Sequence, residues 1–489
     1  MRTGWAFLAL LLAACSTGAV AAPTGNSNVV PEPSVDAGAP LPAEPDAPDA
    51  GEPPPLPPPP SPEPLRLRHE RAFARKVLPA GDGYVVLFDA PVLLREAWGL
   101  PSRTLARVSA RGEERLLHAP REGRQLIDVA THPSGEITAL EASTDGWFLL
   151  RFGRDDRLLG ETHVVDDAIL TDPPAITPAE STSPIEARTH DTGRIAADGE
   201  NIFGGLRTGR HSVVAYRWAW NGSAHEPTTR TLIVPAHAIA ATALHGGSYD
   251  TFGQLEAHYG VFVGVDSAHI GYVGVSHARM ESGAMAKAHQ KVFGQPLPAA
   301  DPDWLDTWVT RVSAHGKRMG TSVVGTEDYE QLYELRGAAH GVYALGRSEH
   351  WNAEGTGFDA LAAHVAPDGQ VTMRRFDVSR GDIAFDAVEE ADGAILVAGA
   401  SGYSQNPNGA SIVEESQSFV RRLHPDGRIE AIALPTGPRH NEARFLLPIA
   451  NALLVAGMTD GPGTHSADGD PALLRATGWL EAIGVSSLR

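Results

Sequence analysis

The 489-residue sequence is poor in cysteine and in positive charge. Its single cysteine, Cys15, excludes an intramolecular disulfide framework and a cysteine-rich zinc site. Only 40 Lys and Arg oppose 60 Asp and Glu, which gives a net charge of -20. Nucleic-acid-binding proteins carry a basic surface, so this balance argues against a nucleic-acid partner.

Catalytic motifs are also missing. The sequence has no G-x-S-x-G nucleophile elbow, no P-loop and no G-x-G-x-x-G after an expected strand. The neighbouring carboxylates Glu389-Glu390 and Glu414-Glu415 would point to opposite faces of a strand. The sequence therefore predicts no catalytic residue, no cofactor-binding residue, no metal ligand and no cofactor.

The N-terminus has the features of a secretory signal, with Arg2 before a short apolar run from Ala6 to Ala14. This run is too short to span a bilayer, which needs about 20 apolar residues. Within it, Leu12-Ala13-Ala14-Cys15 resembles the lipobox of bacterial lipoproteins. The alternative is an ordinary signal that is cut after Ala19-Val20-Ala21.

The lipobox resemblance implies a membrane partner. In that family the signal, here residues 1–14, is removed, and the cysteine, here Cys15, carries a diacylglycerol and an acylated amino group. Several acyl chains anchor a protein stably where one does not. In Gram-negative members an Asp after the cysteine favours the inner membrane, so Ser16 implies the outer membrane. The membrane leaflet stays open.

Residues 15–64 join this cysteine to the rest of the chain. Between Pro23 and Pro64 there are 16 prolines and 7 acidic residues, with no basic and no aromatic residue. Such a composition cannot bury enough apolar surface to fold and favours extended polyproline II. We expect a disordered spacer here; a proline-rich recognition motif is the alternative.

Two short patterns alternate from residue 65 onward, which indicates an internal repeat. The first is an apolar stretch with a basic residue and, five positions later, a turn residue. Its basic residues are Arg107, Arg151, Arg217, Arg311, His364 and Arg422, and Leu473-Leu474-Arg475 is a seventh instance without the turn residue. The second is an apolar strand bounded by turn residues, beginning near Gly83, Gly135, Gly199, Tyr259, Gly341, Gly393 and Asn451. Short β-branched runs bounded by Gly, Asp and Pro are typical of strands.

The repeat length predicts an all-β β-propeller in residues 65–489. Because the domain opens with the second pattern and closes with a lone first pattern, one blade needs strands from both chain ends. Seven blades are expected, with six or eight as alternatives. A departure from the repeat near 266–306, with a helix expected at 280–293, is interpreted as an insertion.

Two units resemble a bacterial β-propeller repeat with a Pro-Asp-Gly turn and a Gly-x-Ile-Leu-Val-Ala-Gly strand. They contain Pro367-Asp368-Gly369 with Gly393–Gly399, and Pro425-Asp426-Gly427 with Leu453–Gly457. The resemblance covers about 100 residues and implies the fold. It implies no single activity, because a fold hosts many functions.

Few residues are candidates for a site. Trp218 and Trp220 lie two apart on an expected strand, so their rings share a face. They are a candidate binding surface for a sugar or peptide, and burial between blades is the alternative. A group of histidines fits no short metal motif: His237, His245, His258, His269, His277 and His289. Asp468-Gly469-Asp470 is interpreted as a turn rather than a calcium site.

The leading hypothesis is a monomeric, lipid-anchored envelope β-propeller that binds a protein or glycan ligand through its loops or channel. A hydrolase of envelope glycans or esters, with its site at the channel, is the first alternative. A purely structural envelope component is the second. Convergent carboxylates or histidines with perturbed pKa values at one face would favour the hydrolase.

Overall fold

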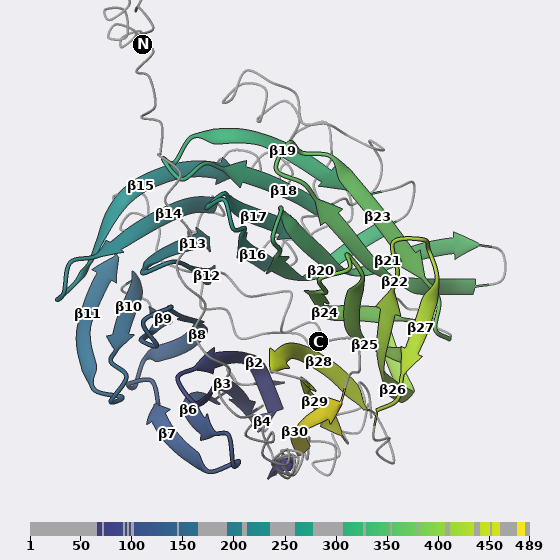
Figure 1. Ribbon diagram of the computed structural model, residues 1–489, viewed down its shortest axis with the longest axis horizontal. Coiled ribbons are helices and arrows are strands. Elements are labelled where there is room, and N and C mark those ends of the chain that lie inside the picture. Colours follow the sequence, from purple (N-terminus) through teal and green to yellow (C-terminus); the bar gives the residue numbers. More distant parts are fainter. Residues whose placement is uncertain are drawn as a thin grey trace, which may run out of the picture. The chain divides into compact units, whose positions relative to one another are not determined.

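The computed structural model in Figure 1 consists of strands and turns. It describes residues 66–70, 73–90, 93–94, 97–98, 102–143, 146–164, 193–207, 213–234, 260–276, 307–325, 329–352, 355–379, 381–405, 411–434, 441–449, 452–459 and 477–484. All of them belong to the compact unit from Pro62 to Arg489. Within these ranges no helix has the length and apolar character needed to cross a membrane.

Seven four-stranded antiparallel sheets make up the described chain, each ordered from its innermost strand outward. The first four are β2(Phe73–Ala80)-β3(Gly83–Ala90)-β6(Ser102–Ser109)-β7(Glu114–His118), β8(Arg124–Thr131)-β9(Ile137–Ser143)-β10(Gly146–Phe152)-β11(Leu158–Val164), β12(Gly193–Asp198)-β13(Asn201–Arg207)-β14(Val213–Trp220)-β15(His225–Val234) and β16(Gly260–Val265)-β17(Gly271–Ser276)-β18(Thr307–Val312)-β19(Arg318–Val324). The others are β20(Tyr329–Gly337)-β21(Val342–Asn352)-β22(Gly355–Val365)-β23(Val371–Phe376), β24(Ile383–Glu389)-β25(Ile395–Gln405)-β26(Ser411–Leu423)-β27(Ile429–Ile432) and β28(Glu442–Ile449)-β29(Ala452–Thr459)-β30(Thr477–Gly484)-β1(Arg66–Glu70). A small hairpin, β4(Leu93–Leu94)-β5(Ala97–Trp98), lies in the connection from β3 to β6.

The innermost strands follow one another round an axis, and each contacts the next, including β28 with β2 (Figure 1). The last sheet is completed from the other end of the chain, because β1 pairs antiparallel with β30 from Arg66↔Glu481 to Glu70↔Thr477. This arrangement is a seven-bladed β-propeller. It confirms the predicted fold, the predicted blade number and the closure by strands from both ends.

The hydrophobic core lies between the blades. In β3, Val85 and Leu87 pack in a cluster with the blade of β8–β11, while Val86 and Phe88 pack in a cluster with the blade of β28–β30. Side chains alternate across a strand, so an uninterrupted apolar run buries both faces of its sheet. Each blade thus needs a neighbour on both sides, which only a closed ring supplies.

The turn residue of the first pattern marks the turn between the third and fourth strands. Gly369 and Gly427 of the Pro-Asp-Gly turns have φ values of 95° and 89°. Asp156 takes the same position in the second blade with φ 64°. A left-handed backbone suits Gly, and Asp tolerates it better than most residues.

The two ends of the propeller differ in their connections. Turns between first and second strands and between third and fourth strands share one end, which we call the turn face; examples are 132–136 and 366–370. All other connections leave from the opposite end, which we call the long-connection face. They include 165–192, 235–259 and 277–306.

Two assignments from the sequence need correction. The run from Tyr259 is grouped by its sequence with the other six instances of the second pattern, all of which form second strands, but it forms the inner strand β16, and the second strand of that blade is β17. The segment between repeat strands is therefore 277–306 rather than 266–306. Both strands are buried on two faces, so their compositions look alike. The predicted helix at 280–293 lies outside the described residues.

The third strand of the closing blade is β30, whereas the sequence placed it at Leu473-Leu474-Arg475, which lies outside the described residues. In β30 the basic position of the repeat is taken by Ala482, since Ala482 pairs with Leu454 as Arg422 pairs with Leu396. The closing blade thus lacks the repeat's basic residue.

Candidate functional site

At the turn face, the basic residue of the repeat joins neighbouring blades in four instances, Arg107, Arg151, Arg217 and Arg311, whereas His364 and Arg422 bond to residues of their own blades. Arg107 donates from Nη1 to the Ala80 carbonyl of its own blade (3.0 Å) and from Nε to Asp156 of the next blade (2.7 Å). Arg311 donates to the Pro367 carbonyl of the next blade at 2.6 Å. The basic residue in the repeat therefore has a structural role, which its recurrence alone did not reveal.

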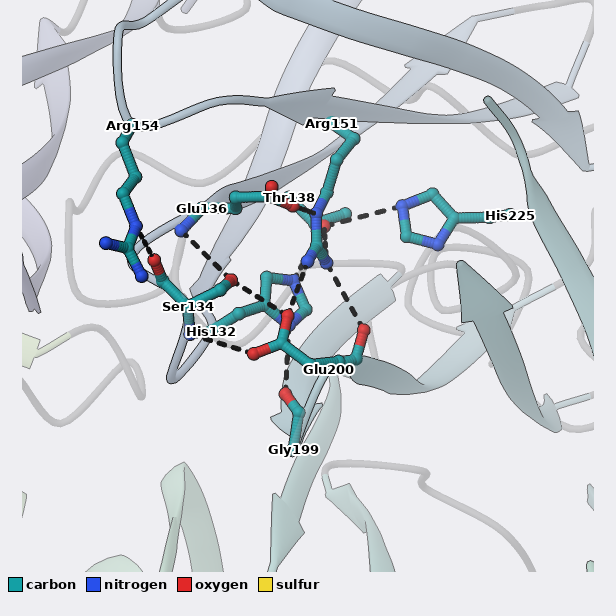
Figure 2. A network of polar contacts seen from close by, with 9 residues as sticks. All are labelled: His132, Ser134, Glu136, Thr138, Arg151, Arg154, Gly199, Glu200 and His225. Atoms are coloured by element: carbon teal, nitrogen blue, oxygen red, sulfur yellow. Dashed lines mark hydrogen bonds and ion pairs between the residues drawn. The ribbon is translucent and has the colours of Figure 1, made fainter. Parts of the chain in front are cut away.

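Arg151 makes the most extensive of these contacts (Figure 2). Its side chain is fully buried, with Nε 2.8 Å from Glu136 Oε2 in its own blade and Nη2 2.9 Å from Glu200 Oε2 in the next. Glu200 also accepts from the Ser134 amide and hydroxyl, each at 2.8 Å. Two carboxylates from two blades thus share one buried guanidinium.

Two histidines lie behind Arg151, on either side of Thr138 (Figure 2). His132 Nδ1 is 3.0 Å from the Gly199 carbonyl, which can only accept, so Nδ1 carries the proton. His132 Nε2 then accepts from the Thr138 hydroxyl at 2.9 Å. Thr138 in turn accepts from His225 Nε2 at 3.4 Å, which leaves His225 Nδ1 without a proton and without a hydrogen-bond partner among the described residues.

Both imidazoles are held neutral. Burial, and then the positive charge of Arg151, lower the pKa of His132 to about 4. The same causes, in the same order, lower the pKa of His225 to about 3. A neutral histidine pair behind an ion-paired arginine holds two blades together, and nothing in this geometry presents an activated nucleophile.

A different arrangement occurs at the long-connection face, where five inner strands carry a β-bulge near their start. In each, one extra residue has no partner on the second strand. These bulge residues are Arg75, Ile127, Tyr333, Phe385 and Arg444. No pattern in the sequence predicted that these five inner strands share a bulge near their start.

Arg444 is the bulge residue of β28, and its side chain is fully buried. Its guanidinium carbon lies 4.8 Å from the Phe73 ring centroid on β2 and 5.2 Å from that of Phe385 on β24. Since β2 and β24 flank β28 on opposite sides, a side chain that contacts both lies on the axis side of the ring. Tyr333 extends this row through an edge-to-face contact with Phe385 at 5.7 Å.

Glu442 supplies a counter-charge to Arg444 from the same strand. Its Oε2 lies 2.6 Å from both Nε and Nη2 of Arg444. Nη1 has no hydrogen-bond acceptor in the part of the chain that the structure describes. More buried charged residues lie near the same ends of their strands: Arg75, Arg103, Arg194, Arg207, Glu330 and Arg347.

Asp382, directly before β24, is a titratable group at this end whose pKa is strongly raised. It is fully buried and accepts from the Val378 amide at 2.5 Å and the Ser379 amide at 3.1 Å. Burial raises the pKa of Asp382 to about 7, with a further contribution from the nearby Asp377. Its carboxyl group therefore changes protonation near neutral pH, a property that suits a general acid or base.

The two tryptophans have different surroundings. Trp218 is 1% exposed and stacks on Tyr216 in the cluster between two blades, so it offers no ring to a ligand. This corrects its placement on a candidate binding surface and matches the alternative of burial. Trp220 is half-buried beside His225 and Arg151. Strand β14 is apolar, with aromatic residues at alternate positions, and most of it packs against the neighbouring blade. Trp220 is its last residue, where the strand is only partly covered.

Of the six histidines considered as metal ligands, only His269 lies in the described ranges, where its Nδ1 is 2.5 Å from Asp198. No group of three or more His, Cys, Asp or Glu in these ranges could hold a metal ion. Glu390, directly after β24, is buried against Arg422, while Glu389, the last residue of β24, is exposed. Cys15 and Asp468-Gly469-Asp470 lie outside the described residues.

Sequence reasoning missed Arg444 and Asp382. A signal for Arg444 existed, since an arginine in the apolar run Ala443–Ile449 has to be paired or stacked when buried. No local pattern in the sequence predicted the contacts of Arg444 with two other blades. Asp382 resembles any turn aspartate in the sequence, and only the tertiary structure buries it.

Comparisons with known proteins bear on the fold. No family model matches the sequence, and no curated protein matches it. The structure is similar to virginiamycin B lyase from Staphylococcus aureus in complex with Quinupristin, with a TM-score of 0.43 at 10% identity over 86% of this chain and 100% of that one. A streptogramin B lyase gives 0.43 at 8% identity over 86% and 98%. A prolyl endopeptidase gives 0.40 at 12% identity over 85% of this chain and 49% of its own.

Proposed function

We propose that this protein is a lipid-anchored β-propeller of the bacterial cell envelope that binds a ligand or partner through its long-connection face. The lipobox-like Leu12-Ala13-Ala14-Cys15 supports lipid attachment at Cys15. The proline-rich residues 16–64 support a spacer between the membrane and the propeller. Ser16 supports the outer membrane as the location.

The observation that carries the binding role is the difference between the two faces. The turn face consists of short turns such as 366–370 and 424–428, whose backbone carbonyls at Pro367 and His424 accept hydrogen bonds from Arg311 and Arg374 of the preceding blades. The connections 165–192, 235–259 and 277–306 leave from the long-connection face, where Arg444 Nη1 has no hydrogen-bond partner among the described residues. Binding residues are disproportionately carried on loops held by a rigid scaffold.

Membrane attachment is tested with Cys15→Ser in the full chain. We expect palmitate labelling to be lost and the protein to move from the membrane pellet to the soluble fraction. Ser16→Asp is the matched control, which should keep the lipid and shift the protein to inner-membrane fractions. Palmitate labelling that persists in Cys15→Ser would contradict the proposed anchor.

The binding face is tested by hydrogen exchange on the full chain in detergent. The probes are soluble glycan released from the envelope and, separately, the periplasmic protein fraction. We expect one of them to slow exchange at 141–143, 205–207 and 382–384, which lie at the long-connection end of their strands, and to leave the turns 132–136 and 266–270 unchanged. Slowing confined to the turn face, or no slowing with either probe, would overturn the proposal.

A hydrolase is the second candidate, favoured by the buried carboxyl group of Asp382. Asp382 accepts hydrogen bonds from two backbone amides at the long-connection face and lies near Asp377. The full chain is assayed on p-nitrophenyl esters and glycosides, where Asp382→Asn should abolish turnover and the rate should change near pH 7. Turnover that Asp382→Asn leaves intact, or no turnover, rejects this role.

A further inference from the structure

We propose that Arg444 binds the carboxylate of a small organic acid on the axis side of β28, within the propeller. The inference deepens the proposed function, because it places a ligand group at the long-connection end of the inner strands. It rests on three observations: the bulge that leaves Arg444 without a cross-strand partner, the two aromatic rings beside it, and the absence of an acceptor at Nη1 within the described ranges.

The bulge determines where the guanidinium lies. Between Ala443 and Phe445 the register with β29 shifts, so Arg444 has no cross-strand partner. Its side chain reaches Phe385 on one side and Phe73 on the other. The guanidinium carbon is thus held between two aromatic rings. Arginine recognises planar anions through in-plane N–H donors, which remain usable beside aromatic rings.

Glu442 uses only part of the donor set of Arg444. A guanidinium has five N–H donors, and one oxygen of Glu442 lies opposite Nε and Nη2 at 2.6 Å. The Nη1 hydrogens remain, on a nitrogen that is fully enclosed and has no acceptor among the described residues. A buried donor on a charged group that stays unpaired is costly, so a hydrogen-bonding partner is expected there.

A carboxylate fits this position better than phosphate does. Its two oxygens match the parallel N–H groups of a guanidinium fork. Glu442 already offsets the charge of Arg444, so a single additional negative charge is tolerated more easily than the two of a phosphate dianion. Arg75, the bulge residue of the neighbouring inner strand, adds buried positive charge on the same end of the ring.

The test is calorimetric titration of the full chain in detergent at pH 7 and fixed ionic strength, with sodium benzoate, sodium acetate and inorganic phosphate as probes. We expect one carboxylate per chain and no measurable phosphate binding. Arg444→Lys keeps the charge beside Glu442 and removes the fork, so benzoate binding should weaken at least about tenfold. Glu442→Gln removes the competing negative charge, so benzoate should bind more tightly. Arg115→Lys, at an exposed site, is the matched control and should bind as the parent does.

Opposite changes in Arg444→Lys and Glu442→Gln separate a binding role from a structural one, which would weaken binding in both. The inference is overturned if neither carboxylate binds, if phosphate binds equally well, or if Arg444→Lys binds benzoate like the parent. If Arg444→Lys does not fold, Glu442→Gln decides, and unchanged or weaker binding overturns the inference. Loss of carboxylate binding with retained exchange protection at the long-connection face removes this inference alone and leaves the proposed function standing.

Discussion

The guanidinium carbon of Arg444 lies 4.8 Å from the ring centroid of Phe73, although 371 positions separate the two residues in the sequence (444 − 73). Arg444 belongs to the last inner strand and Phe73 to the first, so this contact crosses the seam where the ring closes. The repeat's arginine is replaced there by Ala482. The seam is therefore held at its long-connection end by Arg444, and by β1 pairing with β30.

Arg444→Met should destabilise the protein by about 3 kcal/mol, because it removes the counter-charge of the buried Glu442. The double variant Glu442→Gln with Arg444→Met should recover most of this loss, since no buried charge then lacks its partner. Urea unfolding of the three proteins measures both effects. Equal stability of the single and double variants would show that the ion pair is not the cause.

Arg151→Met should lower the free energy of unfolding by about 2 kcal/mol, because a fully buried guanidinium shared by two blades is lost. Its carboxylate partners are partly exposed and can be hydrated again. Arg115→Met is the matched control. Arg115 also pairs with a carboxylate, Asp156, but its side chain is 65% exposed, so its loss should change stability by less than about 0.5 kcal/mol. Urea unfolding distinguishes the two; equal losses would mean that burial does not set the contribution.

Gly271→Ala should lower the thermal unfolding temperature. A Cβ at Gly271 would lie 2.4 Å from the Phe203 ring of the neighbouring blade, and overpacking of this kind costs about 1–3 kcal/mol. Gly357→Ala is the control, because among the described residues no atom beyond its chain neighbours lies within 4 Å of its added Cβ. Thermal unfolding of both variants checks the prediction, which is wrong if the two variants have the same unfolding temperature.

Acid should destabilise the blade interface around His132 and His225. Their pKa values in the folded protein, about 4 and about 3, lie below the ordinary value of 6.5, so the unfolded chain binds protons first. The stability contributed by neutral His132, about 3 kcal/mol, is present above pH 6.5 and is lost as the pH falls toward 4. Melting temperatures should therefore fall between pH 6.5 and 4. The melting temperature of a variant with His132→Gln and His225→Gln should fall less steeply over this pH range. Parallel curves for variant and parent would show that these histidines do not cause the acid destabilisation.

Asp382 should act in the opposite direction. Its pKa of about 7 lies above the ordinary 3.8, so the folded protein favours the protonated form. The stability from that form is present below pH 3.8 and is lost as the pH rises through about 7. Asp382→Asn still accepts the amides of Val378 and Ser379 but carries no charge. The melting temperature of Asp382→Asn should exceed that of the parent, and the excess should be larger at pH 8 than at pH 5. An equal excess at both pH values would count against the raised pKa of Asp382.

The fold was largely readable from the sequence because it follows from local patterns. The Pro-Asp-Gly turns at 367–369 and 425–427 lie where a left-handed residue closes the third strand. The apolar strand at Gly393–Gly399 needs neighbours on both faces. The unmatched patterns at the two ends of the domain predicted the shared blade. Two places differ from the sequence pattern: Tyr259–Gly264, an inner strand with the composition of a second strand, and β30, where Ala482 takes the position of the basic residue.

The sequence by itself determined the repeat, the ring and its closure, because strand and turn preferences act over a few residues. It also determined the distinct composition of residues 15–64. Only the tertiary structure decided which charges meet: that Arg151 joins Glu136 to Glu200, and that Arg444 lies between Phe73 and Phe385. These contacts link residues from different blades, and the bulge that turns Arg444 toward the axis depends on its pairing with another strand. Burial and charge pairing depend on all seven blades together, so no local pattern could specify them.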